Sequence, residues 1–225
     1  MPAPPPPPPP PDDDPSRKAQ ARRVLRRLKA DYPDAVCALR FDTPVQLLVA
    51  TILSAQCTDE RVNQVTEKLF AACPTAEDLA ALPLPELEAY IKPTGFFRNK
   101  AKNIHACCTE LVERHGGEVP RTLEELTPLA GVGRKTANVV LGTAYGIASG
   151  VVVDTHVGRL SRRTGLTTET DPVKVERDLM GLLPKSRWVD FSHQMIYHGR
   201  RVCDARRPKC EACSMRRFCP RVGVG

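Results

Sequence analysis

The sequence has no long hydrophobic run. None of its apolar stretches is long enough to span a bilayer, and its first residues lack the apolar core of a secretory signal. These absences argue against a membrane or secreted protein. Strand-like alternation is nearly absent as well, because residues 150–154 are the one β-like run and are better explained as an extended connector. The remaining pattern is helical with short connections, which predicts an all-α protein.

The sequence also lacks the cysteine pattern of a disulfide-stabilised protein. Nine cysteines is an odd number, and five of them lie within helical apolar patterns, where cysteine acts as a small buried hydrophobe. This usage is typical of a reducing compartment, so we expect a cytoplasmic protein. The five are Cys37, Cys57, Cys73, Cys107 and Cys108.

Positive charge exceeds negative charge, with 33 Lys and Arg against 26 Asp and Glu and a pI near 9.0. Two segments concentrate this excess: residues 16–30 carry seven basic side chains and no acid, and residues 198–221 carry eight against two. Such segments favour a polyanionic partner if they share one face, although two separate solvated surfaces would have the same composition. Residues 1–15 hold ten of the 22 prolines and are predicted to be a disordered or polyproline II tail outside the fold.

Helix-capping residues mark several predicted helix starts. Thr58 precedes acidic residues, Thr122 and Glu125 fit a capping box, and Asp171 precedes a proline. We expect short helices after Thr75 and Thr122. The longer expected helices are 17–29, 44–54, 58–70, 85–91, 99–115, 155–164, 172–183 and 187–201, and residues 138–145 continue the second helix of the hairpin described next.

Residues 129–140 break this helical pattern with two glycines, Gly131 and Gly133. Glycine permits positive φ and close approach of another molecule, and the amides that open a helix favour an anion. Lys135 places an amine beside this predicted phosphate site, and Asp154 follows 19 positions later. An amine next to a phosphate site suggests chemistry on a nucleic acid.

Four late cysteines have the spacing C-x6-C-x2-C-x5-C: Cys203, Cys210, Cys213 and Cys219. Four thiolates so close in sequence can surround a metal centre. The uneven gaps favour an iron–sulfur cluster without excluding zinc, and a reducing compartment argues against disulfides.

The hairpin, the later aspartate and the four-cysteine loop together resemble the endonuclease III family, bifunctional DNA base-excision glycosylases of the helix-hairpin-helix superfamily. The resemblance covers about residues 17–219 and is also carried by residues 53–59, 95–100, 153–157 and 198–200. It implies that the four cysteines hold a [4Fe-4S] cluster.

The resemblance implies a two-lobed helical fold. A six-helix barrel would comprise residues 37–147 and contain the helix-hairpin-helix at about 124–145. A cluster lobe would comprise residues 16–36 and 148–225, with the iron–sulfur loop at 203–219.

The implied activity is removal of oxidised pyrimidines from duplex DNA, followed by cleavage 3′ to the abasic site through β-elimination. The expected partner is duplex DNA with a damaged base or abasic site, bound by a monomer. Within the superfamily, mismatched thymine or uracil and pyrimidine dimers are alternative substrates. A non-catalytic iron–sulfur protein that binds DNA or senses redox state is the alternative from a different class.

The resemblance implies that Lys135 attacks C1′ of the damaged nucleotide and forms a Schiff base. A protonated amine cannot attack, so we expect the helix start and partial burial near Arg134 to disfavour its charge. A solvated lysine is the structural alternative. Asp154 would help to deprotonate the lysine or stabilise positive charge on the sugar, and it is also well placed to cap the next helix.

The remaining implied residues would bind DNA. Gly131, Val132 and Gly133 would donate amides to a phosphate beside Arg134, with a monovalent cation bound by nearby carbonyls. Gln56 would fill the gap left by a flipped nucleotide. Phe96 would be a wedge where the family often has an aliphatic residue, unless it is a core phenylalanine. His156 and His198 are either pocket or core histidines, and His156 is counted among the DNA-binding candidates.

Overall fold

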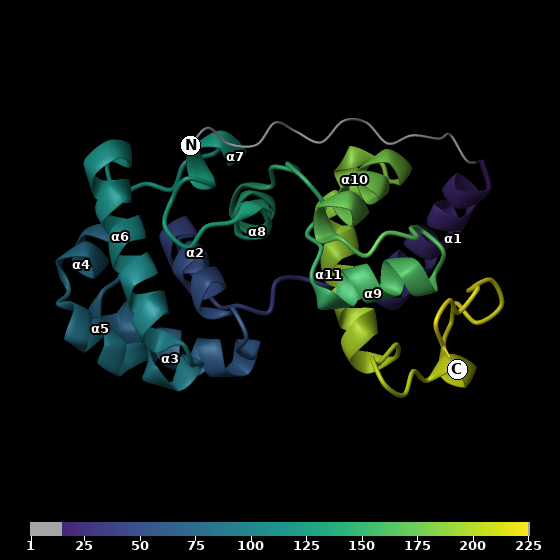
Figure 1. The fold of residues 1–225 in the computed structure, drawn as a ribbon, viewed down its shortest axis with the longest axis horizontal. Helices are drawn as coiled ribbons and strands as arrows, with labels where there is room; N and C mark the ends of the chain where they lie inside the picture. The colour runs from purple at the N-terminus through teal and green to yellow at the C-terminus, as the bar shows by residue number, and fades with distance from the viewer. Residues whose placement is uncertain (1–14, 225) are drawn as a thin grey trace. The chain divides into compact units, whose positions relative to one another are not determined.

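A computed structural model describes residues 15–224 (Figure 1). The described residues contain helices and no strand, which confirms the all-α prediction. No helix in this range is long and apolar enough to cross a membrane. The predicted proline-rich tail lies outside the described residues except for Pro15, which begins helix α1.

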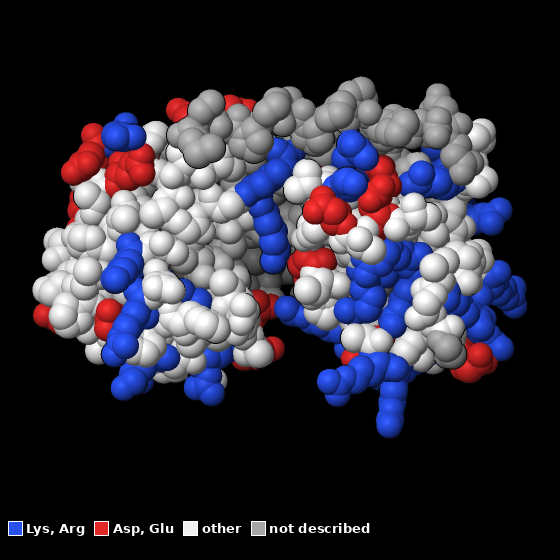
Figure 2. Space-filling model, viewed as in Figure 1, with Lys and Arg blue, Asp and Glu red and all other residues white. Residues whose placement is uncertain are grey.

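The described chain forms two compact units, one of residues 37–149 and one of residues 15–36 and 150–224. Both basic segments identified in the sequence belong to the second unit. Figure 2 shows many Lys and Arg side chains over this unit.

The first unit is built around α2 (Pro44–Leu53), whose residues from Val45 onward are all buried. This helix confirms the one predicted at residues 44–54, and its apolar side chains account for its burial. Helix α8 packs against α2, and α4 and α5 pack against α6. The other elements are α3 (Asp59–Ala72), α4 (Ala76–Ala81), α5 (Leu84–Ile91), the 3-10 turn η1 (Lys92–Thr94), α6 (Phe97–His115), α7 (Leu123–Leu126) and α8 (Arg134–Tyr145).

Local capping sets the helix boundaries in this unit. The hydroxyl of Thr58 accepts from the amide of Arg61 at the start of α3, and Thr75 forms a capping box with Asp78. Helix α6 ends at Gly116, whose φ of 60° favours glycine. These helix boundaries can be predicted from the sequence, because each capping contact joins residues only a few positions apart.

The second unit packs α9 and α1 against α11. Ala21, Val24 and Leu28 form the buried stripe of α1, as their helical spacing predicts. Residues 150–154 form neither a helix nor a strand, as expected for a connector and not for a sheet strand. The elements are α1 (Pro15–Asp31), α9 (Thr155–Arg163), α10 (Pro172–Leu182), η2 (Lys185–Arg187), α11 (Trp188–Arg201) and η3 (Cys210–Ala212).

Candidate nucleic-acid interface and cysteine cluster

The hairpin between α7 and α8 is shaped by Gly131. Its φ is +77°, a conformation that other residues rarely adopt. A Cβ built at Gly131 would lie 2.9 Å from Cβ of Asn103 on α6. Glycine therefore permits both the turn and the close approach of the hairpin to α6.

Helix α8 begins at Arg134 with Gly133 as its N-cap, and no side chain caps its first turn. A helix start without a capping side chain is suited to an anionic ligand. Val132 behaves differently from the expectation that it offers an amide. Its N–H donates to the carbonyl of Leu129 at 3.0 Å, and its side chain is buried, so Val132 anchors the turn from inside.

Lys135 is the second residue of α8, and its side chain is exposed. The expectation of partial burial is therefore wrong. The helix turns Ala137 and Asn138 toward the core instead, which leaves the Lys135 amine on the surface beside the hairpin. The solvated lysine considered as an alternative is therefore the state that the structure shows.

Two exposed residues of the first unit have left-handed backbone conformations. Gln56 has φ 53° and Phe96 has φ 47°, and neither is glycine. Phe96 is 66% exposed, which rules out the alternative that it is a core phenylalanine. Left-handed conformations in non-glycine residues cost about 1–2 kcal/mol and concentrate at functional sites. These two residues are the ones for which the family resemblance implies insertion into DNA.

Asp154 lies in the second unit at the N-cap of α9. Its carboxylate accepts from the amide of Val157 at 2.7 Å, and the side chain is half-buried. Asp154 therefore caps α9, which is one of the two roles expected from the sequence. Lys135, in contrast, belongs to the first unit.

His156 packs into the second unit. Its Nδ1 lies 3.2 Å from a guanidinium nitrogen of Arg159, and a Cβ built at Gly199 would come within 2.6 Å of the same Nδ1. Burial lowers the pKa of His156, while Asp154 acts in the opposite direction. Burial thus favours the neutral imidazole, whose Nδ1 can accept a hydrogen bond from Arg159.

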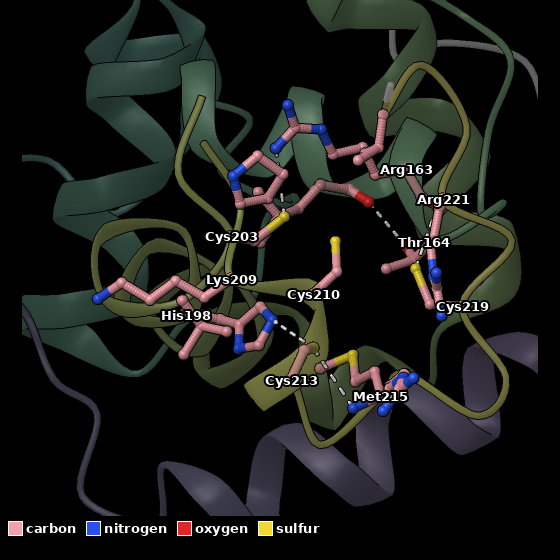
Figure 3. A pocket seen from close by; sticks show the side chains of 15 residues that line it. Arg163, Thr164, His198, Cys203, Lys209, Cys210, Cys213, Met215, Cys219 and Arg221 are labelled. Carbon is pink, nitrogen blue, oxygen red and sulfur yellow. Dashed lines mark hydrogen bonds between the residues drawn. The ribbon is translucent and has the colours of Figure 1, made fainter. Parts of the chain in front are cut away.

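The four late cysteines line one pocket, together with apolar residues and with basic residues that include Arg163, Lys209 and Arg221. Figure 3 shows their side chains around the same space. All nine cysteines of the chain are free, which excludes disulfides among them. Among the described residues, no group of three or more His, Cys, Asp or Glu side chains is arranged to hold a metal ion.

Arg163 is a residue of this pocket that the sequence did not indicate. It is 8% exposed, and one guanidinium nitrogen lies 3.3 Å from Sγ of Cys203. The guanidinium also donates to the carbonyls of Asp204 at 2.6 Å and Ala205 at 2.7 Å. A buried charged fork thus fixes the start of the four-cysteine loop.

His198 is a buried core histidine beside the same loop. Its Nε2 lies 3.5 Å from Sγ of Cys213, and its Nδ1 is 3.0 Å from the hydroxyl of Tyr32. The amide of Met215 donates to Cys213 Sγ at 3.4 Å. Hydrogen bonds to cysteine sulfur are the outer contacts that iron–sulfur sites use, so the surroundings of these thiols fit such a group.

Comparison with known proteins gives the family. The model described as HhH-GPD superfamily base excision DNA repair protein matches residues 49–185. Endonuclease III of Synechocystis sp. is 58% identical over 205 residues, covering 91% of this chain and 94% of that protein. A solved structure of a trapped endonuclease III–DNA covalent intermediate matches with a TM-score of 0.86 at 45% identity, covering 91% of this chain and 96% of that one.

A more distant match shows how widely the fold is shared. The structure of a thermostable thymine-DNA glycosylase aligns with a TM-score of 0.77 at 24% identity, covering 92% of this chain and 96% of that one. At that identity the likeness concerns the fold alone. The much higher identity to endonuclease III over nearly the whole length confirms the resemblance in the sequence motifs: the chain belongs to the endonuclease III family, within the HhH-GPD superfamily of base excision DNA repair proteins.

Proposed function

We propose that this chain removes oxidised pyrimidines from duplex DNA and then cleaves the strand at the abasic site. Membership of the endonuclease III family makes it a bifunctional DNA glycosylase and abasic-site lyase. The main support for Lys135 as the nucleophile is that its side chain is exposed at a helix start whose N-cap is Gly133.

Nζ of Lys135 attacks C1′ of the damaged nucleotide. The N–C1′ bond forms as the bond between C1′ and the base breaks, and the base leaves with that electron pair. Ring opening with protonation of O4′ then gives a Schiff base between Lys135 and C1′. Loss of a proton from C2′ and of the 3′ phosphate completes β-elimination.

Asp154 acts as a general base or as an electrostatic stabiliser during these steps. Its carboxylate accepts the proton that the lysine amine must lose, or it stabilises positive charge on the sugar as the base departs. Its N-cap hydrogen bond to Val157 supports this role, because the bond fixes the carboxylate on a rigid helix start.

Recognition of the duplex involves backbone contacts and base-stack insertion. Gly131 and Gly133 donate amides to a phosphate near Arg134, and a monovalent cation binds to hairpin carbonyls. Gln56 fills the space of the flipped nucleotide, and Phe96 wedges into the opposite strand. Their exposure and left-handed backbones support this assignment. His156 contributes a neutral hydrogen-bonding group at the DNA surface.

Cys203, Cys210, Cys213 and Cys219 hold a [4Fe-4S] cluster. Four free thiols around one pocket, with N–H groups directed at two of the sulfur atoms, support a cluster. When bound, the cluster staples the loop and supplies a redox-capable centre. Purified protein should be brown and contain about four irons per chain. If protein purified without air is colourless and contains zinc, this assignment is refuted.

The free cysteines also support a cytoplasmic location, because a reducing compartment keeps thiols unpaired, and the family match supports association with DNA. Mismatched thymine or uracil and pyrimidine dimers are not favoured as substrates, because the chain is 58% identical to endonuclease III of Synechocystis sp. over 91% of its length.

A panel of duplexes tests the substrate assignment. Each duplex carries one lesion: an oxidised pyrimidine, a thymine or uracil mismatch, or a pyrimidine dimer. We expect strand cleavage to be fastest at the oxidised pyrimidine and to be lost in Lys135→Ala. Faster cleavage at another lesion would replace the substrate class. Equal binding of damaged and intact duplex without any cleavage would identify a non-catalytic DNA-binding module.

A further inference from the structure

Lys100 on α6 is a buried lysine of the first unit, only 5% exposed. Its Nζ donates to the carbonyl of Leu53 at 2.8 Å and to the carbonyl of Thr94 at 2.9 Å. Burial lowers the pKa of Lys100, and nearby Cys57 acts against this shift. A buried ammonium is costly, so a lysine at this position needs a structural or functional reason.

Each of the two carbonyls lies just before a predicted DNA-inserting residue. Leu53 is the last residue of α2, and Gln56 follows three positions later. Thr94 ends η1, and Phe96 follows two positions later. One amine therefore connects the two loops that carry these residues.

The backbones of both loops need such support. Gln56 and Phe96 occupy left-handed conformations, which persist only where surrounding structure fixes them. Their side chains are exposed and supply little packing of their own. The hydrogen bonds from the Lys100 ammonium are charge-assisted, and the carbonyl of Leu53 lies at the negative end of α2.

We propose that Lys100 is a positioning residue that holds the Gln56 and Phe96 loops in register, so that both side chains enter the duplex together. The inference rests on the proposed function of Gln56 and Phe96. Lys100 itself lies behind the surface and does not touch DNA. It acts by keeping two separate loops in one rigid arrangement before DNA binds.

Hydrogen exchange of the DNA-free holoenzyme tests the structural part. The amide of Cys57 donates to Ser54 at 3.1 Å, and the amide of Gly95 donates to Lys92 at 3.4 Å, so each loop contains a reporter. Both amides should exchange about tenfold faster in Lys100→Met, because the loops then open locally. Lys102→Met, at an exposed position of α6, is the matched control and should change neither. Unchanged exchange in Lys100→Met would overturn the proposal.

Single-turnover excision of an oxidised pyrimidine tests the functional part. Lys100→Met should slow excision roughly 10- to 100-fold, because small misplacements of positioning groups have effects of this size. In a Gln56→Ala/Phe96→Ala background the same change should slow excision less than about threefold, because residues that act as one unit are not additive. An equal loss in both backgrounds would show a general structural role and overturn the proposal.

A second variant covers the case of misfolding, and the hydrogen-exchange test covers the case of an inactive parent enzyme. Lys100→Gln, whose amide can donate to one carbonyl, replaces the methionine variant if that variant fails to fold by circular dichroism, and the same two outcomes apply. Should the unmodified enzyme excise no lesion, the proposed function fails. The hydrogen-exchange comparison then still decides whether Lys100 couples the two loops.

Discussion

The carboxylate of Asp154 accepts a 2.7 Å hydrogen bond from the amide of Val157 while it carries the charge proposed for catalysis. One side chain thus caps α9 and serves the reaction. The two roles are separable, because asparagine caps helices about as well as aspartate but has no charge.

Asp154→Asn should therefore leave the free energy of unfolding within about 0.5 kcal/mol of the parent protein and abolish most excision of the damaged base. Asp154→Ala should lose excision and also about 1 kcal/mol of stability, because the cap is removed. Urea denaturation and single-turnover excision measure the two effects. Full excision by Asp154→Asn would remove the carboxylate from the mechanism.

Gly131→Ala should destabilise the chain by about 1–3 kcal/mol and weaken binding to duplex DNA. The added Cβ meets a φ of +77° and a contact of 2.9 Å with Asn103. Gly133→Ala is the matched comparison, because that residue has φ −86° and open space around a Cβ. Equal stability of the two variants by thermal unfolding would show that the hairpin tolerates the strain.

Arg163→Lys should lower the free energy of unfolding by about 1–3 kcal/mol, because a lysine cannot reproduce the hydrogen bonds of the buried fork. The start of the four-cysteine loop would loosen, and iron should be lost faster to a chelator. Visible absorbance over time reports this loss. Arg162→Lys, at the half-buried neighbouring position, should retain iron at the parental rate.

His193 should make the protein less stable in mild acid. Burial lowers its pKa below the ordinary 6.5, and Asp190 opposes the shift. The unfolded chain therefore binds this proton more readily, so stability declines as pH falls from above 6.5 toward the lower folded pKa.

His193→Gln should flatten part of that decline between about pH 7 and pH 5. Urea denaturation across this range, referenced to the difference between variant and parent at pH 8, isolates the contribution of the histidine. A parallel pH dependence in both proteins would show that His193 is not responsible.

The sequence predicts the helices well because their signals are local. Thr58 and Asp171 cap helices within three residues, and the apolar run of α2 requires burial wherever the helix packs. The family is also readable from the sequence, since the hairpin and the cysteine loop are each contiguous. Helix α6 is one of the helices whose starts differ from the prediction. It begins at Phe97, two residues before the predicted start.

The missed features depend on distant partners. The buried ammonium of Lys100 donates to two carbonyls, one of them 47 positions away. The buried guanidinium of Arg163 donates to carbonyls 41 and 42 positions away. No periodic pattern identifies a charged residue that is satisfied in this way. The left-handed backbones of Gln56 and Phe96 are likewise unpredictable, because neither residue type favours that conformation.

Borohydride trapping on an abasic duplex tests the central claim most directly. Reduction of the Schiff base should leave a stable amine bond between protein and DNA, and mass spectrometry should locate that bond at Lys135. Lys135→Ala should form no adduct, while Lys102→Ala, at an exposed lysine of α6, should form it fully. An undiminished adduct in Lys135→Ala, or attachment at another lysine, would contradict the account.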